Sequence, residues 1–157
     1  MFQIKRLNHI VLYVAHLEEV ADFYQTTLKF EVVEQLDHHG IFLRANGSSN
    51  HHDLGLFSVG PHALPVSDKA HVGLYHAAWE VDNIEDLEEV RKALVKTESF
   101  LGQSDHGNSF SLYGVDPDKN EFEVFWMLPK SEWQERNFGV FALDLEEEIK
   151  NRRSKLL

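Results

Sequence analysis

The chain has 157 residues, of which 43% are hydrophobic, and this length and composition suit one folded domain with a hydrophobic core. Its formal net charge of −11 disfavours nucleic acids and anionic membrane surfaces as partners, because an acidic surface repels phosphate groups. The chain has ten His and no Cys, which excludes disulfides, thiolate metal sites and a cysteine nucleophile, so imidazole and carboxylate groups must hold any bound metal.

The first half of the chain predicts one strand, one helix and three further strands, in that order. An apolar run over residues 7–14 is typical of a strand, and residues 17–28 place apolar side chains at helical spacing. Three shorter strand candidates follow, with turn-forming sequence between them. They are residues 30–36, 41–44 and 53–59. The predicted order of this half is therefore β-α-β-β-β.

The second half repeats this order. Residues 72–81 predict a strand, and either Asp82 or Asn83 can cap a helix over residues 84–97. Three strand candidates complete the half. They are residues 100–103, 109–115 and 121–127. The first strand of each half carries a His, namely His9 and His76.

Two segments lie outside the repeat. Residues 60–69 contain two of the four Pro and predict a linker between the halves. After Pro129 the chain first lacks strand character, and residues 143–157 then carry acidic side chains early and basic side chains late, a polarity that favours a helix. We therefore expect one domain over residues 1–128, with modules at about 5–60 and 70–128, and a mainly helical C-terminal extension over residues 129–157.

Strand periodicity divides the polar side chains from the apolar ones. Because successive side chains of a strand point to opposite faces, His9, His76 and Glu123 each lie opposite an apolar face that can pack against a helix. Each of three strands thus presents one candidate metal ligand on the face away from the helices.

The repeat, the His of each first strand and the ending Asp116-Pro117-Asp118-Lys119-Asn120-Glu121-Phe122-Glu123 resemble the vicinal oxygen chelate superfamily, over roughly residues 5–128. This superfamily includes glyoxalases, bleomycin and fosfomycin resistance proteins and type I extradiol dioxygenases. The resemblance implies an α+β fold in which two βαβββ modules form a curved eight-stranded sheet around a metal site, followed here by a C-terminal helix. It implies His9, His76 and Glu123 as the ligands of one divalent metal. Lys119 stands where the family's turn usually has Gly, which affects turn geometry rather than ligation.

The repeat also bears on the number of ligands. In the first half, the counterpart of Glu123 is Leu56 by spacing and Gly55 by strand pattern, and neither side chain can bind a metal. By family resemblance, a glyoxalase I type site has four protein ligands, one of which is a carboxylate at this first-half position. Asp53, the nearest carboxylate, and His52 remain candidates for a fourth ligand in this chain. Two His and one carboxylate with open positions suit non-haem Fe(II) and dioxygen chemistry.

Two further motifs resemble segments of ring-cleaving dioxygenases. Residues 50–57, NHHDLGLF, resemble the HH-x-L-x-F strand of extradiol dioxygenases, which implies that His52 acts as an acid and base. Residues 105–113, DHGNSFSLY, resemble the DHG-x-S-x-S-x-Y segment of catechol 2,3-dioxygenase-like proteins, which implies that His106 and Tyr113 hydrogen-bond substrate oxygens or an oxygen intermediate. The plain alternatives are that His52 belongs to a surface pair of His, that His106 is only a turn residue, and that Tyr113 is a half-buried aromatic of a strand. The remaining His are expected to be solvent-exposed. They are His16, His38, His39, His62 and His71.

These features predict an extradiol ring-cleavage dioxygenase that acts on a catechol-type aromatic diol with dioxygen and uses Fe(II), with Mn(II) as the second choice. Val11, Phe57 and Phe125 are candidates for lining the ring pocket. One alternative is a glyoxalase-like lyase or isomerase that prefers Ni, Co or Zn. Another is a metal-free small-molecule binding or resistance protein.

The sequence also limits location and assembly. Its apolar runs are far shorter than the roughly 20 residues that span a bilayer, and its first residues show no signal-peptide pattern. We therefore expect a cytoplasmic protein without membrane or nucleic-acid partners. Relatives pair their modules either within one chain or across a homodimer, and the sequence leaves both arrangements open.

Overall fold

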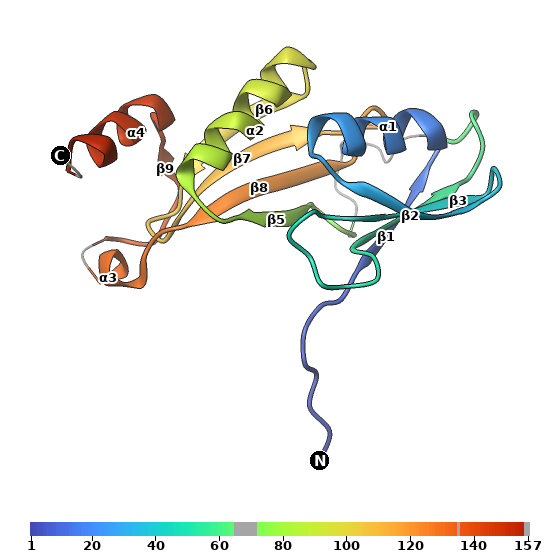
Figure 1. The fold of residues 1–157 in the computed structure, drawn as a ribbon, viewed down its shortest axis with the longest axis horizontal. Coiled ribbons are helices and arrows are strands. Elements are labelled where there is room, and N and C mark those ends of the chain that lie inside the picture. The colour runs from blue at the N-terminus through green and yellow to red at the C-terminus, as the bar shows by residue number, and fades with distance from the viewer. Residues whose placement is uncertain (65–71, 135, 156–157) are drawn as a thin grey trace. The chain divides into compact units, whose positions relative to one another are not determined.

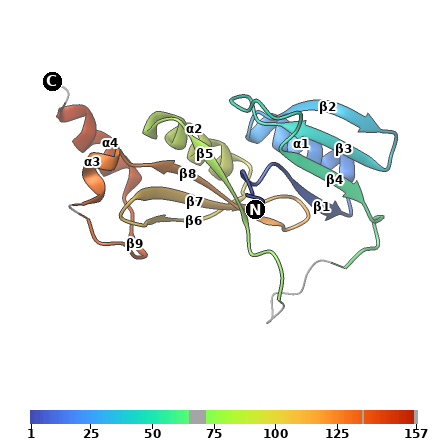
Figure 2. The same ribbon diagram turned by 90° about the horizontal axis from the view of Figure 1, so that it is seen from below.

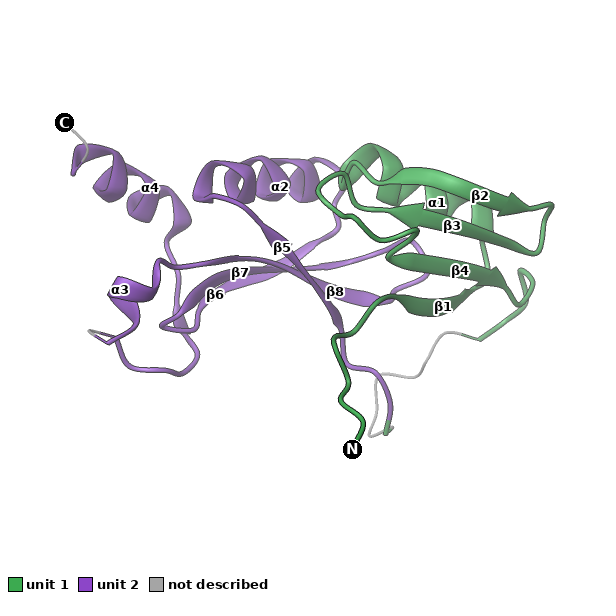
Figure 3. Ribbon diagram, turned by 60° about the horizontal axis from the view of Figure 1, so that its bottom comes forward, with its two compact units in different colours: residues 1–72 green, residues 73–157 purple. Residues whose placement is uncertain are grey.

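The computed structural model describes residues 1–64, 72–134 and 136–155 and divides the chain into two compact units (Figure 3). Unit 1 is Met1–Val72 and unit 2 is Gly73–Leu157. Each unit is described by itself. Part of the predicted linker, residues 65–69, and His71 lie outside the described residues.

Unit 1 is a four-stranded mixed sheet with one helix (Figure 1). Its elements are β1 (Ile10–Val14), α1 (Leu17–Thr27), β2 (Glu31–Leu36), β3 (Gly40–Arg44) and β4 (Leu54–Ser58). The strand order is β1-β4-β3-β2, and β1 runs parallel to β4 while the other neighbours are antiparallel. Helix α1 packs on β3 and β4 through an apolar stripe that includes Val20 and Tyr24, both fully buried.

Unit 2 repeats this arrangement. Its repeated elements are β5 (Ala77–Val81), α2 (Ile84–Lys96), β6 (Phe100–Asp105), β7 (Ser109–Val115) and β8 (Glu121–Met127). The strand order is β5-β8-β7-β6-β9, and β5 is parallel to β8. Asn83 caps α2, since its side-chain oxygen accepts a 2.8 Å hydrogen bond from the Asp86 amide. Leu87 and Leu94 of α2 are fully buried, as are Leu112 and Phe122 of the sheet.

The C-terminal extension adds three elements to unit 2. They are α3 (Lys130–Trp133), β9 (Phe141–Ala142) and α4 (Leu145–Ser154). Strand β9 pairs antiparallel with β6 at the edge of the five-stranded sheet (Figure 2). Helix α4 contacts α2 and buries Leu145 and Ile149, and Arg152 on its last turn donates two hydrogen bonds, of 2.9 and 2.8 Å, to the Glu132 carboxylate of α3.

The structure confirms the predicted α+β class, the two βαβββ modules and the C-terminal helix, with two mixed sheets of four and five strands. The joining of these sheets around a metal site stays a prediction, as do the domain limits. The segment after Pro129 was predicted to lack strand character, and β9 shows that this is wrong: Phe141 and Ala142 form a strand because the free edge of β6 supplies the backbone partners.

Two predicted strands begin later than expected. Strand β1 starts at Ile10 rather than residue 7, and β5 starts at Ala77 rather than residue 72. His9 and His76 therefore each stand immediately before the first residue of their strand, at equivalent places in the two units. Within the described residues, the structure has no helix with the length and apolar character needed to cross a bilayer.

Candidate functional site

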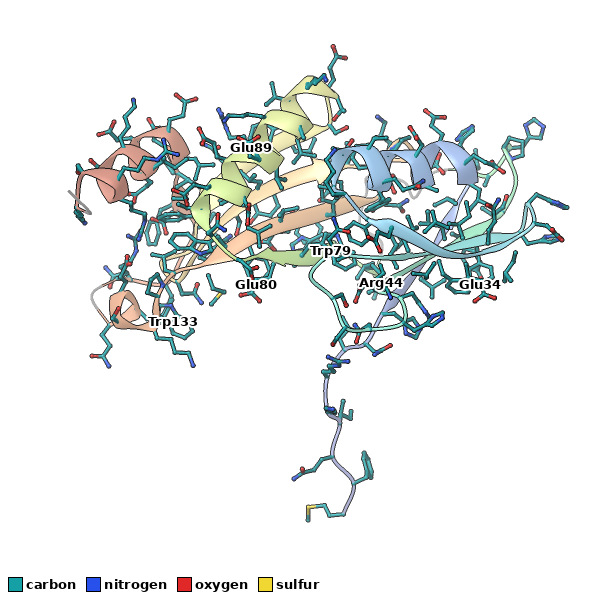
Figure 4. All side chains as sticks on the ribbon, in the orientation of Figure 1. Glu34, Arg44, Trp79, Glu80, Glu89 and Trp133 are labelled. Atoms are coloured by element: carbon teal, nitrogen blue, oxygen red, sulfur yellow. The ribbon has the colours of Figure 1, made fainter. Side chains whose placement is uncertain are left out.

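The strand faces follow the predicted alternation. On β5, Ala78 and Glu80 are exposed, whereas Ala77, Trp79 and Val81 are partly buried. Figure 4 marks the neighbours Trp79 and Glu80 on this strand. The face that His76 shares with Ala78 and Glu80 is therefore the face away from the core of unit 2.

Unit 2 brings His76 and Glu123 together. The His76 Nε2 atom lies 3.1 Å from Glu123 Oε2, and the two side chains are 24% and 13% exposed. Ala78 pairs with Glu123 across the parallel β5–β8 ladder, so the small side chain leaves room for the contact. The His76 ring lies 4.7 Å from that of Tyr75 and 6.0 Å from that of Tyr113.

This pair fits one edge of a divalent metal site. Two donor atoms bound at right angles to a first-row metal at about 2.1 Å each lie about 3 Å apart, close to the separation of His76 Nε2 and Glu123 Oε2. The His76 Nδ1 atom is buried and has no hydrogen-bond partner in the described part of the chain, whereas the other ring nitrogen, Nε2, faces Glu123. Imidazole and carboxylate together suit Fe(II), Mn(II) and Zn(II).

Unit 1 holds His9 and His52 side by side. The centroids of their rings are 4.6 Å apart. The centroid of the Phe42 ring lies 4.8 Å from that of His52. His9 is exposed, and its Nδ1 lies 3.0 Å from Asn8 Oδ1. The pKa of His52 is lowered, first by burial and then by the charges of His9 and His51. His52 lies before β4, two residues ahead of its first residue.

The repeat register identifies the first-half counterpart of Glu123. Gly55 pairs with Val11 of β1 and Phe42 of β3, just as Glu123 pairs with Ala78 of β5 and Tyr113 of β7. The strand-pattern alignment is therefore the correct one, and the position carries no side chain.

Asp53 was also a candidate for a fourth metal ligand, but its carboxylate takes part in hydrogen bonds within unit 1. Its buried carboxylate accepts hydrogen bonds from the Ala45 amide (2.9 Å), Ser48 Oγ (2.8 Å) and Asn50 Nδ2 (2.6 Å). These bonds organise the β3–β4 connection. A carboxylate engaged by three donors in this way is poorly placed to turn toward a metal.

His106 and Tyr113 form a hydrogen-bonded pair in unit 2. The His106 Nε2 atom is 2.7 Å from Tyr113 Oη, and its Nδ1 is 2.9 Å from the Gly139 carbonyl oxygen. Burial, and then the negative charge of Glu123 opposite it on β8, raises the pKa of Tyr113. The phenol is therefore a proton donor rather than a phenolate at neutral pH.

The three predicted metal ligands are divided between the two units. His9 belongs to unit 1 and the pair of His76 and Glu123 to unit 2, and no group of three His, Asp or Glu in metal-binding geometry occurs in residues 1–64, 72–134 and 136–155. Val11 is half exposed, whereas Phe57 and Phe125 are partly buried. The contact of His106 with the Gly139 carbonyl could not be predicted from the sequence, because a backbone group leaves no signal in a motif.

The remaining His side chains agree with expectation where the structure describes them. All four are exposed. They are His16, His38, His39 and His62.

A family model described as the Glyoxalase/Bleomycin resistance protein/Dioxygenase superfamily matches residues 6–124. The chain belongs to this superfamily. Among curated members, the catechol-2,3-dioxygenase of Bacillus subtilis (strain 168) is 27% identical over 137 residues, which are 87% of this chain and 47% of that protein. The biphenyl-2,3-diol 1,2-dioxygenase 2 of Rhodococcus globerulus is 30% identical over 121 residues, which are 76% of this chain and 61% of that protein. The chain thus spans less than two thirds of either relative.

Solved structures of the superfamily share the fold. A glyoxalase/bleomycin resistance protein/dioxygenase domain from Frankia sp. EAN1pec has a TM-score of 0.67 at 17% identity, covering 80% of this chain and 100% of that one. The fosfomycin resistance protein FosX from Listeria monocytogenes has a TM-score of 0.61 at 19% identity, covering 83% and 99%. Because members with this fold are named for different activities, the fold alone does not select the chemistry.

Proposed function

We propose that the protein is an extradiol ring-cleavage dioxygenase that uses Fe(II), or Mn(II) in its place, and opens a catechol-type diol with dioxygen. His76 and Glu123 would bind the metal together with His9, which holds in unit 1 the strand position that His76 holds in unit 2. Both curated relatives described above are named as dioxygenases of aromatic diols.

One observation carries the choice of dioxygenase over glyoxalase-like chemistry. The position equivalent to Glu123 in the first module is Gly55, and the neighbouring Asp53 is engaged by three hydrogen-bond donors. The protein therefore supplies two imidazoles and one carboxylate rather than four ligands. Such a set would hold Fe(II) with positions left open for a diol and for dioxygen, and the metal would supply Lewis-acid and redox chemistry there.

His52 is the proposed acid and base. Its ring lies against that of His9, so it stands beside the diol that a metal held by His9 would bind. Its Nδ1 faces His51 Nδ1 at 3.1 Å, which leaves Nε2 to take a proton from a diol hydroxyl and to return it later. The lowered pKa of His52 keeps the imidazole neutral, and therefore able to accept that proton, at neutral pH.

His106 and Tyr113 are the proposed groups that hydrogen-bond to the substrate. Tyr113 lies directly across the β7–β8 ladder from Glu123, so its phenol lies beside the carboxylate that would bind the metal. Its raised pKa keeps the hydroxyl protonated, and its contact with His106 Nε2 holds that hydroxyl in one orientation.

Anaerobic reconstitution tests the proposal. The protein is loaded with Fe(II), mixed with mono- and bicyclic catechols, and exposed to oxygen while the yellow ring-fission product and oxygen uptake are recorded. We expect one dioxygen consumed per diol. Absence of turnover across these diols, with one metal bound per chain, would refute the assignment.

Two pairs of variants separate the roles. Glu123→Gln should lose the metal, whereas Glu121→Gln, on the same strand face, should retain it. His52→Ala should retain the metal and lower kcat by about 10²-fold or more, whereas His51→Ala should change kcat by only a few fold. Loss of metal from His52→Ala would instead make His52 a ligand.

A further inference from the structure

A segment outside the repeated modules contacts the residues that bear the proposed hydrogen-bonding groups. Residues 136–143, here called the C-terminal segment, lie beyond residues 6–124 that match the family. Within it, Phe141 and Ala142 of β9 pair with Asp105 and Ser104 of β6. The Gly139 amide donates to the His106 carbonyl oxygen at 3.4 Å. The C-terminal segment therefore holds the turn between β6 and β7, which carries His106 (Figure 2).

The C-terminal segment determines which nitrogen of His106 carries the proton. The Gly139 carbonyl oxygen, 2.9 Å from His106 Nδ1, can only accept a hydrogen bond, so Nδ1 must be the donor. In a neutral imidazole Nε2 is then unprotonated and accepts. It lies 2.7 Å from Tyr113 Oη, so the phenol donates to it.

This polarity decides what Tyr113 can offer a substrate. With its hydrogen directed at His106, the Tyr113 oxygen has only lone pairs to offer on the strand face that it shares with Glu123. The Ser104 and Ser111 hydroxyls also interact with this phenol. The Tyr113 oxygen can therefore accept a hydrogen bond from a diol hydroxyl.

We propose that the C-terminal segment is part of the active site, in which the Gly139 carbonyl is a positioning group that fixes His106 as the Nδ1–H tautomer and so makes Tyr113 a hydrogen-bond acceptor toward the substrate. This inference rests on the proposed dioxygenase function. Without the carbonyl, His106 can take the Nε2–H form and donate to Tyr113, which reverses the direction of the pair.

The contacts of the C-terminal segment show how it is held in place. The Arg136 guanidinium pairs with the Asp105 carboxylate and lies 5.4 Å from the centroid of the Phe110 ring. Gln103 Nε2 donates a 2.6 Å hydrogen bond to the Leu143 carbonyl oxygen. Gly107 has a φ of 84°, and a Cβ at this position would overlap the Asn137 carbonyl. The absence of a side chain at Gly107 thus allows the close approach.

The test displaces the C-terminal segment while His106 and Tyr113 themselves are kept. Gly107→Ala places a Cβ against the Asn137 carbonyl, and Arg136→Gln removes the ion pair with Asp105 without any backbone strain. Gly60→Ala is the matched control: its φ of 88° gives the same backbone strain, but nothing lies within 4 Å of the added Cβ.

The first measurement is the tautomer of His106 in the metal-free protein. Imidazole ¹⁵N spectra at about pH 8, above the ordinary His pKa of about 6.5, distinguish protonated from bare ring nitrogens, and the resonances missing from His106→Gln assign the residue. We expect the Nδ1–H form in the wild type and in Gly60→Ala, and a mixture of forms in Gly107→Ala and Arg136→Gln. The proposal is overturned if His106 of the wild type has the Nε2–H form. It is also overturned if the tautomer in Gly107→Ala and Arg136→Gln is that of the wild type although the amide resonances of residues 137–142 have shifted.

The second measurement is turnover of catechol by the Fe(II)-loaded proteins. We expect Gly107→Ala and Arg136→Gln to lower kcat by about tenfold, with KM and metal content within about twofold of the wild type. A kcat that stays at the wild-type value while the tautomer changes overturns the catalytic role. A wild type that turns over no diol refutes the proposed function instead, whereas the spectra decide the tautomer in either case.

Discussion

Arg152 links α4 to α3 and to the five-stranded sheet, and its replacement by Met should destabilise unit 2. Its guanidinium donates two hydrogen bonds to Glu132 and lies 4.9 Å from the centroid of the Trp126 ring and 5.5 Å from that of Phe110. The Arg152 side chain is 20% exposed. Met keeps the apolar stem in place and removes only the charge and its hydrogen bonds.

The contacts set the size of the effect. A hydrogen bond to a charged group contributes about 1.5–3 kcal/mol, and the lower value suits Glu132, which is 34% exposed and can be hydrated in the variant. Cation–π contacts with two rings add about 1 kcal/mol together. We therefore expect Arg152→Met to lower the free energy of unfolding by about 2–3 kcal/mol in urea titrations followed by circular dichroism.

Arg153→Met is the matched control. Arg153 is 58% exposed, and its ion pairs with Glu85 and Glu88 are 3.8 and 3.7 Å long, so its loss should cost no more than about 0.5 kcal/mol. Equal unfolding free energies for the two variants would refute the reasoning.

The effect of Arg152→Met should depend on pH. Arg152 lowers the pKa of Glu132 below its ordinary 4.5, chiefly through the hydrogen bonds. A carboxyl group with a depressed pKa in the folded state contributes its stability above the unfolded-state pKa and loses it as the pH falls through the folded-state value. The difference between wild type and Arg152→Met should therefore be constant above about pH 5 and shrink below pH 4.5, leaving the part that comes from the rings.

Three further substitutions test the turn and the number of metal ligands. Lys119→Gly should raise the free energy of unfolding by about 0.5–1 kcal/mol in urea titrations, because the exposed Lys119 has a φ of 69°, and an unchanged or lower stability would contradict this account. Asp53→Asn should lower the free energy of unfolding by about 1–3 kcal/mol and leave the metal-to-protein ratio unchanged, since its carboxylate serves the β3–β4 connection; a fall in that ratio would make it a ligand. In Gly55→Glu the added Cβ lies 3.3–3.4 Å from Val11 and Phe42, and the new carboxylate should become a fourth metal ligand, seen as slower metal loss to a chelator together with loss of oxygen uptake. Wild-type rates in both assays would contradict the placing of Gly55 beside the metal.

The elements with strong local patterns could be predicted closely from the sequence. The predicted limits of β7 and β8 agree with the structure, because apolar and polar residues alternate along them and a turn separates them. Helix α2 begins where Asn83 can accept a hydrogen bond from a backbone amide. Strand periodicity also placed His76 and Glu123 on one face, and the structure brings those two side chains into contact.

The elements that depend on distant partners could not be predicted. Strand β9 has two residues and forms because the edge of β6 is free to pair with it. Residues 72–76 have strand-like composition, yet β5 begins only at Ala77, where the ladder with Phe122 of β8 begins. The Gly139 carbonyl that contacts His106 is a backbone group. In each case the decisive interaction joins residues far apart in sequence, which local propensity does not encode.

The repeat register allows the two units to be compared residue by residue without reference to how they are placed. At equivalent positions of the two ladders, unit 1 has Val11, Gly55 and Phe42 where unit 2 has Ala78, Glu123 and Tyr113. The first set is apolar, and the second has a small residue beside a carboxylate and a phenol. Duplicated modules with the same backbone thus present faces of different chemical character, and this difference requires only three changes of side chain at equivalent positions.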